Sequence, residues 1–440
     1  MTCIHEFFSP DYQKALKQQT FELNTYEQRL TKYKELLIDG IQSLSVECSC
    51  SYCDIIGYSV NSNCAIEYMS QYIDCLKSLS SEIEKFCNTL IDSYKLFIKE
   101  SYYSATSKFW EIIDNYNLVT VADNSIFNER IFYRARYNDH SFDINNPINN
   151  FHIRFDNRYL VSNQRFSVAG QPMWYLGNSI IDICRELNKD LDELVIYGFL
   201  PTFKIIKSLI LLDSIIFNKF VKNLPFSINI TIEQVKSDIQ KTILYEFLIF
   251  PRRHERFRAF SEEYILSQAY TTYVLNQDKW NGIIYPSSKD YSDIKNVHPY
   301  SRYNYNCALF TNYSEGEIYD KNLFYQTYHD YSALYFDKNE NDVTLSEAKN
   351  KIETLCKINQ ELKSPCLAYS LHSEQDLFEY LKDATLNGES FFDTQYGKAE
   401  LKMFAKLCNI LREAMYYQYE QKSTILPVSK HLNLIEWILY

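Results

Sequence analysis

Glycine and proline are scarce in this sequence of 440 residues, which contains 9 and 10 of them respectively. Contents this low exclude collagen-like and low-complexity chains. A hydrophobic fraction of 46% also excludes a chain that is disordered throughout. The length exceeds that of an ordinary single domain, so we expect about two or three domains.

Long apolar runs are also missing. A membrane helix needs ~20 apolar residues, and the most apolar stretch, 203–217, is interrupted by Lys204, Lys207 and Asp213. The first residues lack the basic and apolar regions of a signal peptide. These absences predict a cytoplasmic protein without a membrane partner, in which the 12 cysteines are reduced thiols.

Basic residues are outnumbered, with 45 Lys and Arg against 56 Asp and Glu and a net charge of −11. Proteins that grip a phosphate backbone do so through many Lys and Arg, so we do not expect nucleic acid as a partner. The Walker loop and the GxGxxG, HExxH and GxSxG motifs are absent. ATPases, dehydrogenases, zincin proteases and α/β-hydrolases therefore lack their usual support.

Apolar periodicity predicts a helical N-terminal region over residues 1–122. A stripe over 64–100 would form a helix about 55 Å long if unbroken, and the segment 12–44 could pair with it as an antiparallel hairpin. We favour a bundle in which this stripe packs internally. A surface for a partner or a second protomer is the alternative.

The remaining chain divides at residue 337. Short apolar runs separated by breakers predict strands with one inserted helix over 123–336. Residues 337–440 have helical periodicity, and Thr344 and Glu347 have the spacing of a capping box. The predicted fold class is α+β, with a mixed β core between mainly α-helical N- and C-terminal regions.

Polar residues interrupt the predicted strands of the central region. They are Arg134 and Arg136 in "FYRAR", Arg165 before a turn with Gly170 and Pro172, Tyr175 in the next strand, Glu186 at the end of a helix begun after Ser179, Tyr285, Ser287 and Ser288 in "GIIYPSS", and Asn306 in "YNYNCALF". Each residue alone is ordinary on an exposed strand face. Together, arginines bind phosphates, tyrosines stack on heterocycles and a carboxylate stabilises a ribose-centred cation. The set predicts a site for a nucleotide with a labile glycosidic bond.

The order of these motifs resembles a RES domain over residues 126–310, with "RFSVAGQPMWYLGNS" followed by "CREL" as the strongest part. RES domains are similar in fold to ADP-ribosyltransferases, and characterised members are toxins that consume NAD+ by phosphorolysis or hydrolysis. Many sit beside a neutralising antitoxin, and larger relatives resemble components of antiphage or stress-response systems. The long segment 203–250 makes this a larger form of the domain.

The resemblance implies roles for individual residues. Arg165, Glu186 and Ser287 match catalytic positions, while Tyr133, Arg134, Tyr175, Tyr285 and Ser288 match or flank substrate-binding positions. Arg165 would neutralise the pyrophosphate of NAD+, the expected substrate. Glu186 would stabilise the oxocarbenium-like transition state, and Ser287 would orient Glu186 or the ribose. No metal is expected.

Several alternatives stay open. The acceptor could be water, phosphate or a macromolecule, and the chain could instead be a nucleotide sensor that does not turn over NAD+. "RARYNDH", from Arg134 to His140, fits the loose Arg-x5-His pattern of HEPN ribonucleases. The cysteines Cys48, Cys50, Cys53 and Cys64 contain one Cys-x-x-Cys half-site for zinc. An antitoxin or regulatory protein is an expected partner, and the helical flanks are candidates for regulation or homo-oligomerisation.

Overall fold

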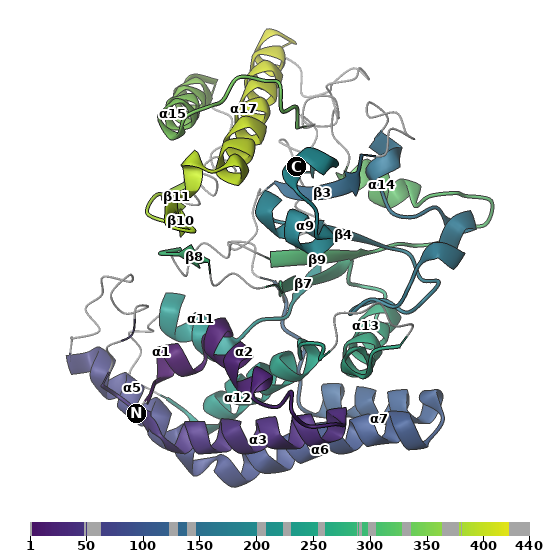
Figure 1. The fold of residues 1–440 in the computed structure, drawn as a ribbon, viewed down its shortest axis with the longest axis vertical. Helices are drawn as coiled ribbons and strands as arrows, with labels where there is room; N and C mark the ends of the chain where they lie inside the picture. The colour runs from purple at the N-terminus through teal and green to yellow at the C-terminus, as the bar shows by residue number, and fades with distance from the viewer. Residues whose placement is uncertain are drawn as a thin grey trace. The chain divides into compact units, whose positions relative to one another are not determined.

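The computed structural model divides the chain into two compact units, each assembled from separate segments (Figure 1). Unit 1 comprises Met1–Thr120, Val161–Gln171 and Leu212–Trp280, and unit 2 comprises Val121–Leu160, Pro172–Leu211 and Asn281–Tyr440. The residues that the structure describes are 2–47, 50, 63–122, 131–138, 147–199, 208–222, 230–253, 260–287, 289, 293–297, 305–327, 336–362, 378–379 and 381–421.

The two units divide the chain differently from the three consecutive regions 1–122, 123–336 and 337–440 expected from the sequence. Two segments of the expected central region join the N-terminal helices in unit 1, and the expected C-terminal region shares unit 2 with the sheet. Local periodicity identifies elements but carries no information on which distant elements pack together, and this is why the boundaries differ.

Unit 1 is mainly helical. Its helices are α1 Ile4–Phe7, α2 Pro10–Gln18, α3 Tyr26–Gln42, α5 Asn63–Ser78, α6 Ser80–Lys99, α7 Tyr102–Asn115, α11 Ile215–Lys222, α12 Ile232–Leu248 and α13 Ile265–Asn276, with η5 at Glu262–Tyr264 and short parallel strands β1 Thr2–Cys3 and β2 Leu44–Ser45. The apolar stripe over 64–100, which would be one helix if unbroken, therefore forms two helices, α5 and α6. Serines flank the break, and the Ser78 and Ser80 hydroxyls donate to the carbonyls of Cys75 and Lys77 at 2.7 and 2.8 Å. Such local bonds compete with helix continuation.

Helices α3 and α6 pair in antiparallel fashion (Figure 1). Lys95, late in α6, lies 3.2 Å from Glu27 early in α3. Lys34, in the middle of α3, donates to Asn88 at 3.0 Å. The predicted antiparallel pairing is therefore present between α3 and α6, although α5 lies between these two helices in the chain.

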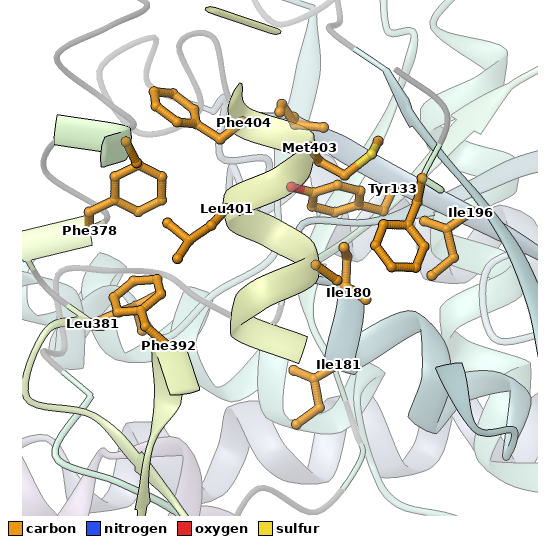
Figure 2. Packing of buried hydrophobic residues seen from close by; sticks show 14 of the residues in the cluster. Tyr133, Ile180, Ile181, Ile196, Phe378, Leu381, Phe392, Leu401, Met403 and Phe404 are labelled. Atoms are coloured by element: carbon orange, nitrogen blue, oxygen red, sulfur yellow. The ribbon is translucent and has the colours of Figure 1, made fainter. Parts of the chain in front are cut away.

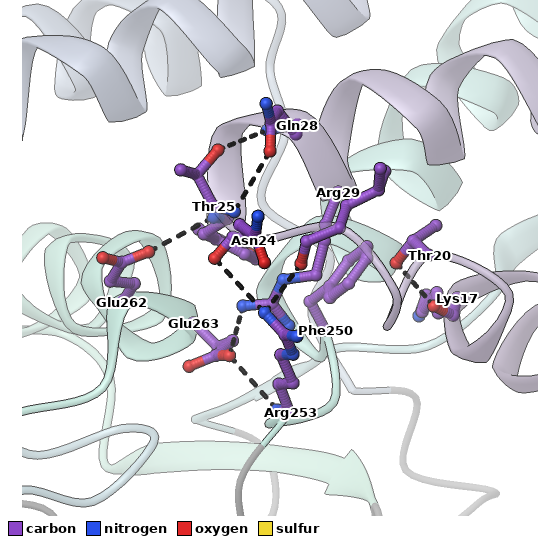
Figure 3. A network of polar contacts seen from close by, with 12 residues as sticks. Lys17, Thr20, Asn24, Thr25, Gln28, Arg29, Phe250, Arg253, Glu262 and Glu263 are labelled. Carbon is purple, nitrogen blue, oxygen red and sulfur yellow. Dashed lines mark hydrogen bonds and ion pairs between the residues drawn. The ribbon is translucent and has the colours of Figure 1, made fainter.

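Two ion pairs are buried among the helices of unit 1. Lys17 of α2 pairs with Glu246 of α12, and both side chains are 2% exposed. Burial lowers the pKa of Lys17 and raises the pKa of Glu246, because each charged form is removed from water. Arg29 donates to Glu263 at 2.6 Å, and the same Glu263 oxygen accepts the backbone N–H of Arg253 at 3.3 Å (Figure 3).

Unit 2 is built on a six-stranded mixed sheet with the order β5-β3-β4-β9-β7-β6. The strands are β3 Phe132–Tyr137, β4 Met173–Gly177, β5 Leu194–Phe199, β6 Leu209–Leu211, β7 Gly282–Pro286 and β9 Tyr305–Phe310. All pairs are antiparallel except β6 with β7. The described structure is therefore α+β with a mixed sheet, as predicted.

The two faces of the sheet carry separate apolar cores. One face packs against α9 Ile180–Leu187, and this core continues into α17 Gln395–Gln421 and then α15 Leu345–Leu362, which packs on α17. Figure 2 shows Leu401 and Met403 of α17 within this core. The other face is centred on the fully buried Trp174. The remaining named elements of unit 2 are η2 Pro147–Asn150, η3 Phe155–Leu160, η4 Leu191–Glu193, β8 Ile294–Lys295, α14 Lys321–Thr327, β10 Thr385–Leu386, β11 Glu389–Ser390 and η8 Phe391–Asp393.

The capping box predicted before α15 is present. The backbone N–H of Thr344 donates to Glu347 at 2.7 Å, and the N–H of Glu347 donates to the Thr344 hydroxyl at 3.2 Å. Among the helices that the structure describes, none combines the length and the apolar character needed to cross a membrane.

Candidate functional site

Glu186 stands in the last turn of α9, where the sequence predicted it. The helix begins because the Ser179 hydroxyl accepts the backbone N–H of Asp182 at 3.1 Å. It ends at Asn188, which adopts φ 52° in the left-handed region that asparagine tolerates. This placement leaves the Glu186 side chain 38% exposed at the end of the helix.

Two neutral donors share one oxygen of the Glu186 carboxylate. The Ser287 hydroxyl, directly after β7, donates to Oε1 at 3.0 Å, and Nδ2 of Asn306 in β9 donates to the same oxygen at 3.2 Å. The ammonium of Lys289 lies 3.9 Å from Oε2. Since both Lys289 and Glu186 are over a third exposed, this ion pair is weak. The predicted contact between Ser287 and Glu186 is confirmed, while its catalytic role stays a prediction.

A row of four residues crosses the sheet below α9. The register pairs Tyr133 with Gly177, Gly177 with Asn306, and Asn306 with Tyr285. Paired residues on neighbouring strands share a face. The row therefore places Tyr133 and Tyr285 on the same face of the sheet as the Asn306 side chain that bonds Glu186.

Gly177 allows α9 to approach the sheet closely. A Cβ at this position would lie 2.9 Å from Cγ2 of Ile183 and 3.1 Å from Oδ2 of Asp182, both in α9. Any side chain would therefore push the helix away. The glycine of "YLGNS" thus helps to set the height of the helix that carries Glu186 above the sheet.

The three predicted tyrosines differ in exposure. Tyr133 and Tyr285 are buried, at 5% and 8%, and Tyr133 belongs to the core beneath α9. Tyr175 is half-buried and lies two residues before Gly177, so strand alternation places it on the same face. Ring stacking on a heterocycle requires an accessible ring. Tyr175 fits the predicted binding role better than the other two.

Arg134 does not join this cluster. It follows Tyr133 on β3, so alternation turns its side chain to the opposite face of the sheet. Its Nη1 donates to the carbonyl of Tyr175 at 2.8 Å, and its Nε is buried without a hydrogen-bond partner. Burial, with a smaller contribution from Arg136, lowers its pKa to about 10. Strands β3 and β4 pair at Tyr133 and Gly177, and the bond from Arg134 to the Tyr175 carbonyl is a further link between the two strands.

Arg165 belongs to unit 1, whereas Glu186 and Ser287 belong to unit 2. It is 8% exposed, and its Nη1 donates to the carbonyls of Leu248 and Phe250 at 3.1 and 3.0 Å. The guanidinium carbon lies 5.0 Å from the centre of the Tyr264 ring. Arg165 thus binds the carbonyl end of α12, where a cation is favourable. The expected role of Arg165 at the pyrophosphate of NAD+ stays a prediction.

Two cysteine thiols near the site are unreactive. Burial raises the pKa of Cys184, in α9, to about 12. Burial also raises the pKa of Cys307, the neighbour of Asn306 in β9, well above its usual range. Both thiols stay protonated at neutral pH and are poor nucleophiles. Neither thiol therefore accounts for a nucleophile in this cluster.

Sequence reasoning assigned no role to Asn306 or Glu400. Asn306 was noted from the sequence only as a polar residue within a predicted strand. Apart from the Tyr305 hydroxyl, the other side chains of β9 are apolar. Glu400 of α17 accepts the backbone N–H of Ile180 at 2.8 Å. No sequence signal connects Glu400 to α9, because the two lie 220 residues apart.

Several predicted residues lie outside the described residues. They are Ser288 of the substrate-binding set, His140 of the ribonuclease pattern, and Cys48 and Cys53 of the zinc hypothesis. Within the described parts of the chain, no three His, Cys, Asp or Glu side chains are grouped so that they could hold a metal ion.

Comparisons with known proteins add no relative to this picture. No protein-family model, no curated protein and no solved structure matches the chain.

Proposed function

We propose that unit 2 cleaves the nicotinamide–ribose bond of NAD+, with Glu186 as the catalytic carboxylate. The motif order resembling a RES domain supports this proposal. The observation that carries it is the pair of neutral donors, Ser287 and Asn306, on one oxygen of an exposed Glu186. The Glu186 side chain is 38% exposed, and Lys289 lies 3.9 Å from its second oxygen.

The chemistry needs a fixed negative charge. Nicotinamide leaves as a neutral base from a cationic substrate, so the bond between its nitrogen and C1′ of the ribose can break without a strong general acid. Positive charge then develops on the ribose, and a preorganised carboxylate stabilises it. Neutral donors orient Glu186 without cancelling its charge. Attack by water at C1′ gives ADP-ribose and a proton, and attack by phosphate gives ADP-ribose 1″-phosphate.

The resemblance supports a biological role as a cytoplasmic toxin or an antiphage or stress effector that depletes NAD+. Such an activity requires control in its own cell, by an antitoxin or another regulatory protein. Transfer of ADP-ribose to a macromolecule is an alternative that uses the same bound NAD+ and the same bond cleavage. Retention of adenine-labelled NAD+ on protein or nucleic acid would distinguish transfer from release.

A second candidate function is nucleotide binding without turnover. It needs a ring that stacks on the base, and half-buried Tyr175 offers one, but it needs no catalytic carboxylate. The donation by Arg134 and Arg165 to backbone carbonyls weighs against both candidate functions. The ribonuclease alternative is weaker, because its pattern requires a helix and Arg134 lies on strand β3.

The test is NAD+ consumption by the purified full chain, with and without phosphate, with products resolved by chromatography. We expect nicotinamide release that falls by about 10²–10³-fold in Glu186→Gln. The matched control is Glu315→Gln, an exposed glutamate of the same unit, which should keep the wild-type rate. Equal turnover in Glu186→Gln and the control would refute the assignment. NAD+ binding without turnover by the wild-type protein would instead support the second candidate.

A further inference from the structure

We propose that helix α17 positions the candidate active site, with Glu400 as a positioning residue that fixes α9 and, through it, Glu186. The inference rests on the proposed function for its catalytic consequence. The contacts that carry it involve a part of the chain outside the segment that resembles a RES domain.

Glu400 completes the N-terminal end of α9. The backbone N–H of Ile180 is the first of this helix and has no acceptor within it, and Oε1 of Glu400 accepts it at 2.8 Å. Ile180 is 0% exposed and Glu400 is 4% exposed, so water does not replace this bond easily. A carboxylate at a helix N-terminus is also favoured by the helix dipole. The Ser179 hydroxyl accepts a different amide, that of Asp182.

The C-terminal part of the chain also holds the opposite end of α9. Arg185, the residue before Glu186, donates from Nη2 to both carboxylate oxygens of Asp293 at 2.8 and 2.7 Å. The carbonyl of Asp293 accepts the backbone N–H of Asn387 at 3.0 Å. Strand β10, just before Asn387, pairs with β8, just after Asp293. The segment that leads into α17 therefore anchors the salt bridge beside Glu186.

Apolar packing also links α9 to α17. Ile180 and Ile181 share one core with Leu401, Met403 and Phe404 of α17 (Figure 2). An eight-residue helix is too short to be stable by itself. The position of α9 is consequently set by what it packs against. Catalytic groups displaced by about 1 Å can lose about 10² in rate, so a shift of α9 should reach Glu186.

The experiment compares full-length variants at position 400. Glu400→Leu keeps the volume and removes the acceptor, whereas Glu400→Gln keeps an acceptor oxygen at the same reach and should preserve function. Glu353→Leu, on an exposed face of α15, is the matched control. NAD+ turnover gives kcat and KM, and hydrogen exchange mass spectrometry follows peptides from α9 and, as a reference for overall stability, from β9.

We expect Glu400→Leu to lower kcat by about 10-fold or more with KM changed less than about 3-fold, and Glu400→Gln to stay within about 3-fold of wild type. Exchange in the α9 peptide should rise about 10-fold more than exchange in the β9 peptide. A merely structural role would raise exchange in both peptides equally. Wild-type kcat and α9 exchange in Glu400→Leu would overturn the proposal.

The proposed function and the positioning role of Glu400 can be refuted independently. If the wild-type protein shows no NAD+ turnover, the proposed function fails, and the exchange of α9 still decides whether Glu400 positions the helix. If Glu400→Leu does not fold, Glu400→Asp replaces it. Aspartate keeps the carboxylate charge, but its side chain is one methylene group shorter and ends farther from the Ile180 N–H. The same selective rise in α9 exchange is therefore expected. Unchanged α9 exchange in Glu400→Asp would then count against the proposal.

Discussion

Replacing Arg165 by methionine separates a structural role of this residue from the substrate-binding role that its sequence context predicts. Methionine keeps an apolar stem of similar length and has no donor. The guanidinium now donates to the carbonyls of Leu248 and Phe250 at 3.1 and 3.0 Å, at the end of α12. In Arg165→Met both carbonyls lose this donor inside unit 1.

The magnitude follows from these contacts. A hydrogen bond from a charged donor is worth about 1.5–3 kcal/mol, but the Leu248 carbonyl also accepts from the Ser267 hydroxyl at 2.6 Å. The main loss is therefore at Phe250, and the lost cation at the helix end adds up to about 1 kcal/mol. Removal of Arg165 also relieves its repulsion of buried Lys17, whose pKa it helps to lower. We expect unit 1 to lose about 2–4 kcal/mol of unfolding free energy.

The assay is urea unfolding read by hydrogen exchange of α12 and α13 peptides, which reports unit 1 separately. Arg252→Met is the control, because Arg252 lies 5.6 Å from the same Tyr264 ring and is exposed. An exposed substitution of this kind should cost less than about 0.5 kcal/mol. Equal stability of the two variants would refute the structural account. Loss of NAD+ turnover in such a stable Arg165→Met protein would restore the predicted catalytic role.

Two further predictions concern buried titratable groups. His152 accepts the N–H of Asp320 at 3.0 Å, and burial lowers its pKa from 6.5 to about 4. Between pH 6.5 and about 4, His152 is therefore protonated in the unfolded chain but still neutral in the folded protein. Because protonation favours the unfolded chain, unit 2 should be about 2 kcal/mol less stable at about pH 5 than at about pH 7.5. In urea unfolding, His152→Gln should not show this loss of unfolding free energy between about pH 7.5 and about pH 5. A loss as large as that of the wild type would contradict the assignment. In unit 1, Lys17→Met should cost about 3–5 kcal/mol in unfolding free energy because Glu246 stays buried without its cation; Lys17→Met/Glu246→Leu should recover most of this loss, and a double variant no more stable than the single one would argue against it.

Local signals predicted the helix that carries Glu186. Ser179 begins α9 as a side-chain cap, and the left-handed Asn188 ends it. The strands also followed from short apolar runs, and β7 and β9 fall within the quoted runs "GIIYPSS" and "YNYNCALF". These features depend on neighbours a few residues away in sequence, which is why they could be recognised without a structure.

Long-range packing was not predictable in the same way. Gln268 of α13 donates to the carbonyls of Gln164 and Ser167 at 2.9 and 3.1 Å, and so holds the segment around Arg165 within unit 1. Glu400 reaches α9 across 220 residues of sequence. Neither contact has a periodicity or a motif of its own. The sequence therefore predicted the contact between Ser287 and Glu186 but not the packing of the segment around Arg165.

Both arginines of the predicted site donate to backbone carbonyls. Arg134 bonds the Tyr175 carbonyl where β3 and β4 separate, and Arg165 bonds the carbonyls at the end of α12. An arginine bound in this way contributes to stability in the absence of any ligand. Glu186 differs, because its charge is exposed and its two donors are neutral. If the proposed function holds, substitutions of Arg134 and Arg165 should act first on folding, whereas Glu186→Gln should act on turnover with folding intact.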